Sequence, residues 1–372
     1  MNRPVKRIAV LVVPACAALV FAAAAAAATR ADVVAAKADA YLRARTVEGK
    51  FSGTVLVARK SEVLFIKGYG FANEEWGVAN DANTRFPIAS ITKTFTAVLV
   101  LEMQRQRKLS LTDPVCRHVS PCPKSWSAIT IRHLLTHTAG IPDYAKDPDF
   151  MQKVRLRRDL AGIIAGFRDR PLTSPPGTRY EYSNSGYLLL GHVLERVGRK
   201  TYEQLLREHI FEPLGMRHTL LDDNARLVPR RASGYRASGR TRSNADFVDT
   251  SWLYSAGGIH STAGDLLIWV RAHLAGKILP REEVNRMWAP ALGTYGYGWQ
   301  LLSPSPQTLD RRLVFHAGGT TGFATDLLVY PEEEVTVIIL ANLMPVALAD
   351  LSRDLSAIVF GDSPPSRRAS RH

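Results

Sequence analysis

The chain has 372 residues, of which 46% are hydrophobic and 22% charged, and its formal net charge is +14. This composition is typical of a globular protein with one large or two modest domains, and the lack of an internal period or heptad run excludes repeat architectures and coiled coils. The positive charge comes without a recognised nucleic-acid-binding motif, so we expect no nucleic-acid partner.

Residues 1–28 have the pattern of a secretory signal peptide. The basic segment MNRPVKR precedes a long, alanine-rich apolar run that ends in small residues. We expect cleavage after Ala28 or Ala31, and hence an exported protein, periplasmic or secreted, with no transmembrane segment after cleavage. The alternative is an uncleaved N-terminal segment that tethers the protein, because the apolar run is long enough to span a bilayer.

The predicted elements form three groups along the chain. The first group is a helix over 32–45 and strands over 51–58 and 62–72. Helices dominate the second group, over 90–107, 129–140, 185–198 and 201–215. Strands return over 296–302, 313–319, 322–331 and 334–342, and a helix over roughly 346–360 closes the chain.

This order predicts an α+β fold with one antiparallel sheet flanked by helices. Residues 32–85 and 285–362 would form the sheet domain, and residues 86–284 a mainly helical inserted domain. We expect the basic tail, 363–372, to be disordered. Ligand sites often form where two such parts meet.

Only two cysteines remain after the expected processing, and both lie in the proline-rich loop DPVCRHVSPCP. In an oxidising compartment, Cys116 and Cys122 are expected to form a short-loop disulfide. The alternative, half of a metal site, lacks a second cysteine pair. We expect no metal and no cofactor.

One basic stretch stands out, RLVPRRASGYRASGRTR at 226–242. The main interpretation is a solvated, flexible loop rich in Gly, Ser and Arg. The alternative is contact with an anionic polymer or lipid of the cell envelope.

The sequence Ser90-Ile-Thr-Lys93 opens the predicted helix at 90–107. Residues three apart share a helix face, so Lys93 is within reach of the Ser90 hydroxyl. A lysine whose pKa is lowered by burial or by neighbouring positive charge is able to accept the serine proton. The alternative is an N-capping serine beside a surface lysine.

Two further patterns strengthen the catalytic interpretation. Tyr182-Ser-Asn184 precedes a helix, where a nearby lysine would ease the loss of the tyrosine proton and the asparagine would contact both substrate and lysine. His316-Ala-Gly318 ends a strand whose small residues would let a substrate approach. The alternatives are a helix-capping asparagine and a tight hairpin with an incidental histidine.

With these three motifs in this order, the chain resembles the serine β-lactamase and penicillin-binding protein superfamily. The resemblance is strongest to the branch that contains class C β-lactamases, D-alanyl-D-alanine carboxypeptidases and related esterases. It extends over about 35–345 and includes ITIRHLLTHTAGIPDY, PPGTRYEYSNSGYLLLG, IFEPLGMRHT and SAGGIHSTAGDLLIW. It implies a β-lactamase/transpeptidase-like fold.

The resemblance also implies roles for the motif residues. Ser90 would be acylated, and Lys93 and Tyr182 would share the general acid and base duties, with the acylation base left open between them. Asn184 would orient the substrate and the lysine. The backbone N–H groups of Ser90 and Gly319 would form the oxyanion hole.

The third motif departs from the family pattern. His316 stands where many members have the lysine of a Lys-Thr-Gly triplet, and Ala317 replaces the threonine. A neutral histidine would hold a substrate carboxylate less firmly, which argues against efficient β-lactam hydrolysis and leaves esterase or peptidase activity open. Gly318 would keep the strand edge open.

The sequence therefore predicts a serine hydrolase that forms an acyl-enzyme on Ser90 and cleaves a β-lactam, a D-amino-acid peptide or a carboxylic ester. The alternatives are a penicillin-binding sensor that acylates without turnover and a non-catalytic structural member of the fold. His133 and His137 have the spacing of a zinc-protease pair, but Leu134 occupies the place of the required glutamate. We interpret both histidines as structural.

Overall fold

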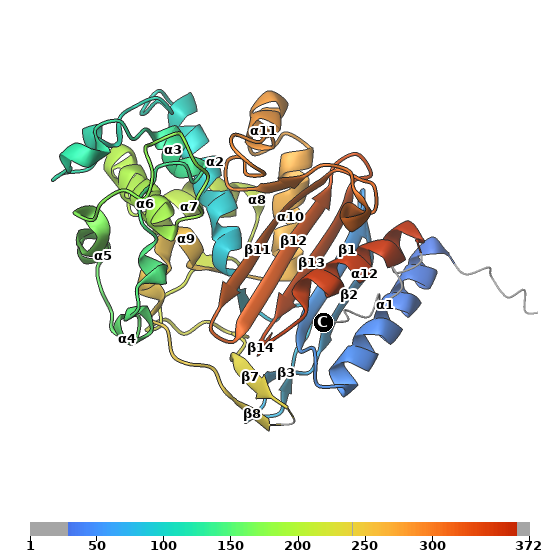
Figure 1. The fold of residues 1–372 in the computed structure, drawn as a ribbon. Helices are drawn as coiled ribbons and strands as arrows, with labels where there is room; N and C mark the ends of the chain where they lie inside the picture. Colours follow the sequence, from blue (N-terminus) through green and yellow to red (C-terminus); the bar gives the residue numbers. More distant parts are fainter. Residues whose placement is uncertain (1–28, 240, 363–372) are drawn as a thin grey trace, which may run out of the picture.

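The computed structural model describes residues 29–239 and 241–362 of the chain (Figure 1). The predicted signal peptide and the basic tail lie outside these residues and stay predictions. Within the described residues, no helix combines the length and the apolar character needed to cross a membrane.

A six-stranded antiparallel sheet forms the centre of the molecule, in the order β10-β11-β12-β13-β1-β2. Its strands are β1 (Gly53–Arg59), β2 (Glu62–Tyr69), β10 (Gln300–Leu302), β11 (Leu313–Thr320), β12 (Phe323–Tyr330) and β13 (Val335–Ala341). The two ends of the chain meet where β1 pairs with β13, from Gly53 opposite Ala341 to Arg59 opposite Val335. The predicted sheet, built from both ends of the sequence, is confirmed.

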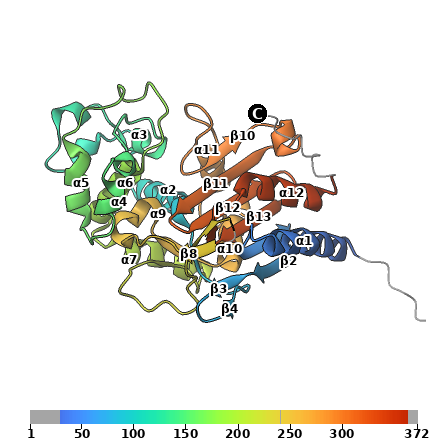
Figure 2. The same cartoon turned by 60° about the horizontal axis from the view of Figure 1, so that its bottom comes forward.

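Helices cover both faces of this sheet. The helices α1 (Arg30–Val47) and α12 (Leu348–Phe360) lie side by side on one face (Figures 1 and 2). The helix α10 (Ala263–Leu274) packs against β1 and β13 from the other face. Both β12 and β13 are buried along their whole length, so apolar residues occupy both faces of each strand and neither sequence alternates between apolar and polar residues.

The helical part of the molecule surrounds α2 (Thr92–Arg105). This helix packs against α6 (Asn184–Gly198) and α9 (Tyr254–Gly257), and nearly all of its side chains are buried. The Phe95 ring on α2 stacks on Trp269 of α10, with ring centroids 4.0 Å apart. The helix that follows Ser90 is thereby fixed between the sheet side and the helical side of the molecule.

Shorter elements complete the fold. The other helices are α3 (Ile131–Leu135), α4 (Phe150–Lys153), α5 (Leu160–Arg168), α7 (Tyr202–Leu206), α8 (Glu212–Leu214) and α11 (Arg281–Met287). The other strands are β3 (Phe71–Asn73), β4 (Val78–Ala79), β5 (Phe86–Pro87), β6 (Leu220–Leu221), β7 (Tyr235–Ser238), β8 (Thr241–Asn244), β9 (Ile259–Ser261) and β14 (Leu343–Met344). The division into a sheet domain and an inserted domain stays a prediction.

Several predicted helix boundaries are corrected by the structure. The helix expected from Ser90 begins with a 3₁₀ turn, η1 (Ala89–Ile91), and α2 ends at Arg105. The helix expected over 129–140 is only α3, because the chain turns at His137 and Gly140, which have positive φ angles. The helix expected over 201–215 is divided by a π-helical turn, η5 (Arg207–Phe211), between α7 and α8.

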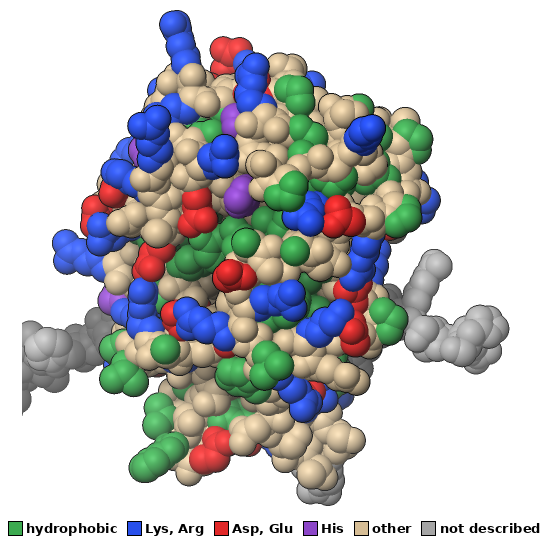
Figure 3. Space-filling view, turned by 90° about the vertical axis from the view of Figure 1, so that its left-hand side faces the viewer, with side chains coloured by type: hydrophobic (Ala, Val, Ile, Leu, Met, Phe, Trp, Pro, Cys, Tyr) green, Lys and Arg blue, Asp and Glu red, His purple; other side chains and the backbone are tan. Residues whose placement is uncertain are grey.

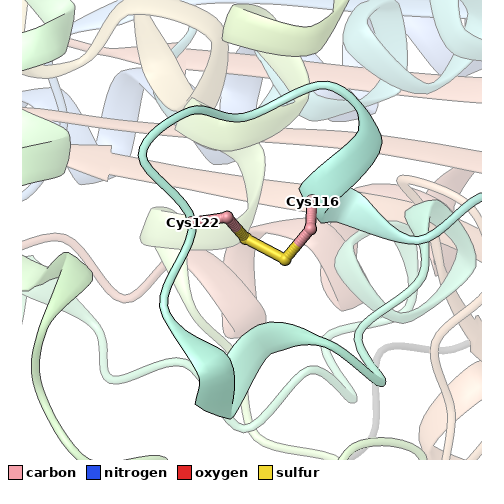
Figure 4. Close-up of a disulfide and its surroundings, with 2 residues drawn as sticks. All are labelled: Cys116 and Cys122. Carbon is pink, nitrogen blue, oxygen red and sulfur yellow. A yellow bond between two sulfur atoms is a disulfide. The ribbon is translucent and has the colours of Figure 1, made fainter.

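The predicted disulfide joins Cys116 to Cys122, with a Cα–Cα distance of 5.4 Å (Figure 4). It closes the loop between α2 and α3. The sequence interpretation of these two cysteines is confirmed.

The basic stretch 226–242 is not a free loop, because β7 pairs there with β8. Its described arginines form ion pairs with carboxylates outside the stretch, among them Arg226–Glu203, Arg230–Asp81, Arg231–Asp222 and Arg242–Glu74. On the face drawn in Figure 3, basic and acidic side chains are likewise intermixed. The expectation of a loop is therefore wrong for β7 and for the part of β8 in this stretch, whereas 226–234 is irregular, and contact with an anionic envelope component stays a prediction.

Candidate active site

Ser90 lies on η1, in the short connection between β5 and α2. The preceding residue, Ala89, has φ = +45°, a left-handed conformation that is uncommon for any residue other than glycine. The turn is anchored by Ile88, whose N–H donates to the carbonyl of Ile259 on β9 at 2.9 Å. Backbone strain of this kind is typical of functional sites, where the surrounding structure holds it.

Lys93 lies one turn further, in the first turn of α2, and its side chain is completely buried. Its Nζ is 3.0 Å from Ser90 Oγ, 2.9 Å from Asn184 Oδ1 and 2.6 Å from the carbonyl oxygen of Ala256. The alternative interpretation of Lys93 as a surface lysine is therefore wrong. The structure brings Ser90, Lys93 and Asn184 into one hydrogen-bonded group.

Burial lowers the pKa of Lys93 to about 7, and the negative charge of Asp143 partly opposes this shift. The predicted lowering is thus an effect of desolvation. Near neutral pH, a large fraction of the amine is uncharged. A neutral amine has two N–H groups and one lone pair, which suits two carbonyl acceptors and one hydroxyl that is able to donate.

Tyr182 lies two residues before the start of α6, beside Ser90 and Lys93. The Nζ of Lys93 is 5.0 Å from the centroid of its ring. Burial raises the pKa of Tyr182 above its ordinary value, although the hydrogen bond with the Ser90 hydroxyl opposes this shift. We predicted that the neighbouring lysine would ease the loss of the phenol proton; desolvation dominates the shift in this structure, and the effect of the lysine stays a prediction.

Asn184 is oriented by Asp143, which the sequence analysis did not identify. The Asn184 backbone N–H donates to Asp143 Oδ1 at 3.2 Å, and its Nδ2 lies 3.1 Å from Oδ2. These bonds leave the amide oxygen of Asn184 to face Lys93. The sequence signal was an aspartate after proline in GIPDY, which by itself indicates only a turn.

His316 lies on β11 and is buried. Its Nδ1 donates to the carbonyl of Ala317 at 2.7 Å, and its Nε2 accepts from the Tyr295 hydroxyl at 2.9 Å. Burial and the proximity of Lys93 lower the pKa of His316 to about 3, so the ring is neutral. Both nitrogens have protein partners, so in this arrangement the ring has no N–H to give a substrate carboxylate. Substrate binding by His316 stays a prediction.

The two glycines after Ala317 have different surroundings. A Cβ atom on Gly318 would lie 2.4 Å from the carbonyl oxygen of Ile88 and 2.5 Å from Thr325 Oγ1. Gly318 therefore lets β11 pack directly against the turn that carries Ser90. A Cβ atom on Gly319 would meet nothing within 4 Å, so Gly319 is the residue with open space beside it.

A pocket of about 250 Å³ opens at Ser90. Most of its wall is apolar, and its lining includes Tyr144, Ala145, Phe150, Met151, Val248, Leu253, Gly319 and Thr320. Among its described lining residues there is no charged side chain. A second cavity of about 460 Å³ shares part of this wall, including Val248, Leu253 and Thr320.

The two histidines with zinc-protease spacing do not form a metal site. Among the described residues, no group of three or more His, Cys, Asp or Glu side chains is placed to hold a metal ion. The Nδ1 of His133 accepts the backbone N–H of Thr130 at the start of α3. His137 lies against the Tyr182 ring, with centroids 4.2 Å apart.

Comparison with known proteins relates the chain to the Beta-lactamase family and to penicillin-binding proteins. A family model described as Beta-lactamase matches residues 38–358. The putative penicillin-binding protein PbpX of Bacillus subtilis (strain 168) is 30% identical over 250 residues, which are 67% of this chain and 62% of that protein. The chain spans about three fifths of the length of the curated relatives that head the comparison.

Solved structures share the fold. The octameric penicillin-binding protein homologue from Pyrococcus abyssi has a TM-score of 0.77 and 25% identity, over 89% of this chain and 78% of that chain. The D-amino acid amidase from Ochrobactrum anthropi SV3 has a TM-score of 0.76 and 22% identity, over 89% and 97%. The second likeness concerns the fold alone.

Proposed function

Because the chain belongs to the Beta-lactamase family, whose fold and relatives support a hydrolase, we propose that it is a serine hydrolase with an acyl-enzyme intermediate. Ser90 is the nucleophile, Lys93 is the acylation base, and Tyr182 relays the proton to the leaving group. The single observation that carries this proposal is the buried Lys93 amine, 3.0 Å from Ser90 Oγ.

In acylation, Ser90 Oγ attacks the carbonyl carbon of an ester or amide while its proton passes to Lys93 Nζ. The carbonyl oxygen becomes an oxyanion, which accepts hydrogen bonds from the backbone N–H groups of Ser90 and Gly319. As the tetrahedral intermediate collapses, the leaving group takes the Tyr182 hydroxyl proton, and the Lys93 ammonium restores it. The acyl group stays on Ser90 Oγ.

In deacylation, a water molecule attacks the ester carbonyl and gives its proton to the same Lys93 and Tyr182 pair. The intermediate then releases the carboxylic acid, and the proton returns to Ser90 Oγ. Lys93 suits the base role because its pKa is about 7, and a general base works best when its pKa is close to the pH at which the protein operates. Tyr182 suits the relay role because its raised pKa keeps the phenol protonated.

Two features near Ser90 indicate which substrates the site would accept: the apolar pocket and the hydrogen bonding of His316. The pocket of about 250 Å³ would take a largely apolar acyl group. His316 has no free N–H that could bind a carboxylate on the leaving group, because both of its ring nitrogens already have protein partners. We therefore expect carboxylic esters and uncharged amides to react faster than β-lactams or peptides with a free C-terminal carboxylate.

The test is covalent labelling of the purified protein with a fluorophosphonate, located by mass spectrometry, together with hydrolysis assays. The substrates are short-chain nitrophenyl esters, a D-amino acid amide, a D-Ala-D-Ala peptide and a chromogenic cephalosporin. Ser90→Ala is expected to lose labelling and hydrolysis together, and labelling of that variant would refute the assignment. A β-lactam adduct that persists for hours without product release would favour the penicillin-binding sensor.

We also propose that the protein acts outside the cytoplasm. The disulfide between Cys116 and Cys122 supports this location, because such bonds persist mainly in oxidising compartments. Mass spectrometry of the N-terminus in the exported protein is the test. A mature chain that begins near residue 29 or 32 is expected, and an intact N-terminus on protein retained in the cytoplasm would contradict the proposal.

A further inference from the structure

His137 is a buried histidine that the catalytic steps above do not use. It follows the short helix α3, has φ = +56°, and is 2% exposed. A positive φ angle costs energy for a residue other than glycine, and asparagine is among those that tolerate it best. Histidine and asparagine are among the residues found most often in this conformation, so His137→Asn is compatible with the backbone at this position.

The hydrogen bonds of His137 lie on both sides of Tyr182. The backbone N–H of Ser183 donates to His137 Nδ1 at 3.2 Å, and the backbone N–H of Glu181 donates to the His137 carbonyl at 2.8 Å. One residue thus fixes the two chain neighbours of the tyrosine. Because Nδ1 accepts a hydrogen bond, its lone pair must be free, so the proton of the neutral ring is on Nε2.

The imidazole also limits where the Tyr182 ring is able to go. The His137 ring is 4.2 Å from the Tyr182 ring and 4.5 Å from the Tyr295 ring, measured between centroids. Within the described residues, His137 Nε2 has no hydrogen-bond partner. A buried polar atom of this kind is a cost that packing alone does not explain, because an apolar side chain of similar shape would avoid it.

We propose that His137 is a positioning residue that clamps the Tyr182 loop and holds the phenol at Ser90 and Lys93. This inference rests on the proposed function, because His137 would affect the reaction rate only by holding Tyr182 where it relays the proton. It assigns a role to the second histidine of RHLLTH, whose spacing otherwise imitates a zinc motif. His137 contacts no reacting atom in this scheme.

Two substitutions separate the clamp from packing. His137→Asn keeps an acceptor close to the Nδ1 position and tolerates the left-handed backbone, whereas His137→Leu keeps the bulk and loses the acceptor. We expect the hydrolysis rate of a D-amino acid amide, whose amine leaving group needs the relayed proton, to stay within about threefold of the wild type for His137→Asn and to fall at least tenfold for His137→Leu. This loss is smaller than the roughly 100-fold or more that full general acid–base catalysis contributes. The loss should appear in kcat, with the KM for the amide unchanged.

A double-mutant cycle tests whether the effect passes through the phenol. In a Tyr182→Phe background, His137→Leu should cost no more than about a further twofold, because the group that His137 positions has gone. A tenfold loss in both backgrounds, or a wild-type rate for His137→Leu alone, would overturn the proposal. If His137→Leu does not fold, His137→Gln takes its place, because its amide reaches toward the Nε2 position and leaves Nδ1 unreplaced.

A structural readout makes the two possible failures distinguishable. If the wild type is not labelled at Ser90, the proposed function fails, but amide hydrogen exchange still tests the clamp. We expect a peptide that spans 181–184 to exchange faster in His137→Leu than in the wild type and His137→Asn. Equal exchange in all three proteins would refute the clamp whatever the catalytic outcome.

Discussion

Lowering the pH from 8 to 6 should slow the acylation of Ser90 about tenfold if Lys93 is the base. The reason is that only the uncharged amine accepts the serine proton, and burial sets its pKa at about 7. Protonation of Lys93 on the acid side of this pKa therefore removes the base. The rate should rise with pH and become level above about pH 8.

The magnitude follows from the titration of a single group. With a pKa of about 7, roughly one tenth of the amine is neutral at pH 6 and roughly nine tenths at pH 8. With the ordinary lysine pKa of 10.5, the rate would instead keep rising about tenfold per pH unit through pH 9. The two cases differ most clearly above pH 8.

The assay is the second-order rate of fluorophosphonate labelling between pH 5 and 10, because this probe carries no group that titrates in that range. A rate that still rises tenfold per unit at pH 9, or one that does not depend on pH, would refute the role of Lys93. Lys93→Ala should be slower by about 100-fold or more and should lack the acid limb.

Asp143→Asn provides a second perturbation of the same pKa. The Asp143 carboxylate raises the pKa of Lys93, so its neutralisation should move the acid limb to lower pH. Because Asp143 also orients Asn184, the comparison uses each protein's rate at pH 6 divided by its own rate at pH 9. This ratio should be higher in Asp143→Asn, and a lower ratio would contradict the electrostatic argument.

Three further predictions concern other parts of the molecule. Gly318→Ala should lower the free energy of unfolding by roughly 1–3 kcal/mol and impair labelling, because its Cβ would lie 2.4 Å from the Ile88 carbonyl oxygen. The matched control Gly319→Ala should change the free energy of unfolding by no more than about 0.5 kcal/mol, because its Cβ would meet nothing within 4 Å. Thermal or urea unfolding measures both, and equal effects would contradict the packing role of Gly318. Burial raises the pKa of Asp326 from 3.8 to about 7, so ionisation of this carboxyl disfavours the folded state. The free energy of unfolding should therefore fall by about 4 kcal/mol in total as the pH rises from about 4 to 7. Asp326→Asn should therefore be more stable than the wild type at pH 8 but not at pH 4, and parallel pH profiles of the two proteins would refute this. Finally, methyl 4-acetoxybenzoate should be hydrolysed faster than 4-acetoxybenzoate, whose leaving group carries a free carboxylate that His316 has no N–H to bind. An equal or reversed preference would show that another group binds this carboxylate.

The sequence was sufficient for the features that depend on local spacing. The pattern of 322–331 and 334–342 predicted strands where β12 and β13 form, and the three-residue spacing of Ser90 and Lys93 predicted that they would meet. The oxidising compartment expected for an exported chain predicted the bond between Cys116 and Cys122, which share one short loop. In each case, the partners lie within one strand, one helical turn or one loop, so their geometry follows from the backbone.

The remaining features depend on contacts between distant segments, and no local pattern contains them. The role of Asp143 arises only because a turn before α4 meets the start of α6. Gly318 was predicted to open a strand edge, but the approach of the Ile88 carbonyl gives it a packing role instead. Tyr295, 21 residues before His316, donates to its Nε2, so the one N–H of the neutral ring is on Nδ1, where the Ala317 carbonyl accepts it.

The sequence by itself determined which groups are present for chemistry: a hydroxyl, an amine, a phenol and an amide in a fixed chain order. Only the tertiary structure decided their charge states. The pKa of an amine is set by the water that its surroundings exclude, and Lys93 is desolvated jointly by α2, α6 and α9. The same desolvation raises the pKa of the Tyr182 phenol, which is why the proposed mechanism gives the base role to the lysine.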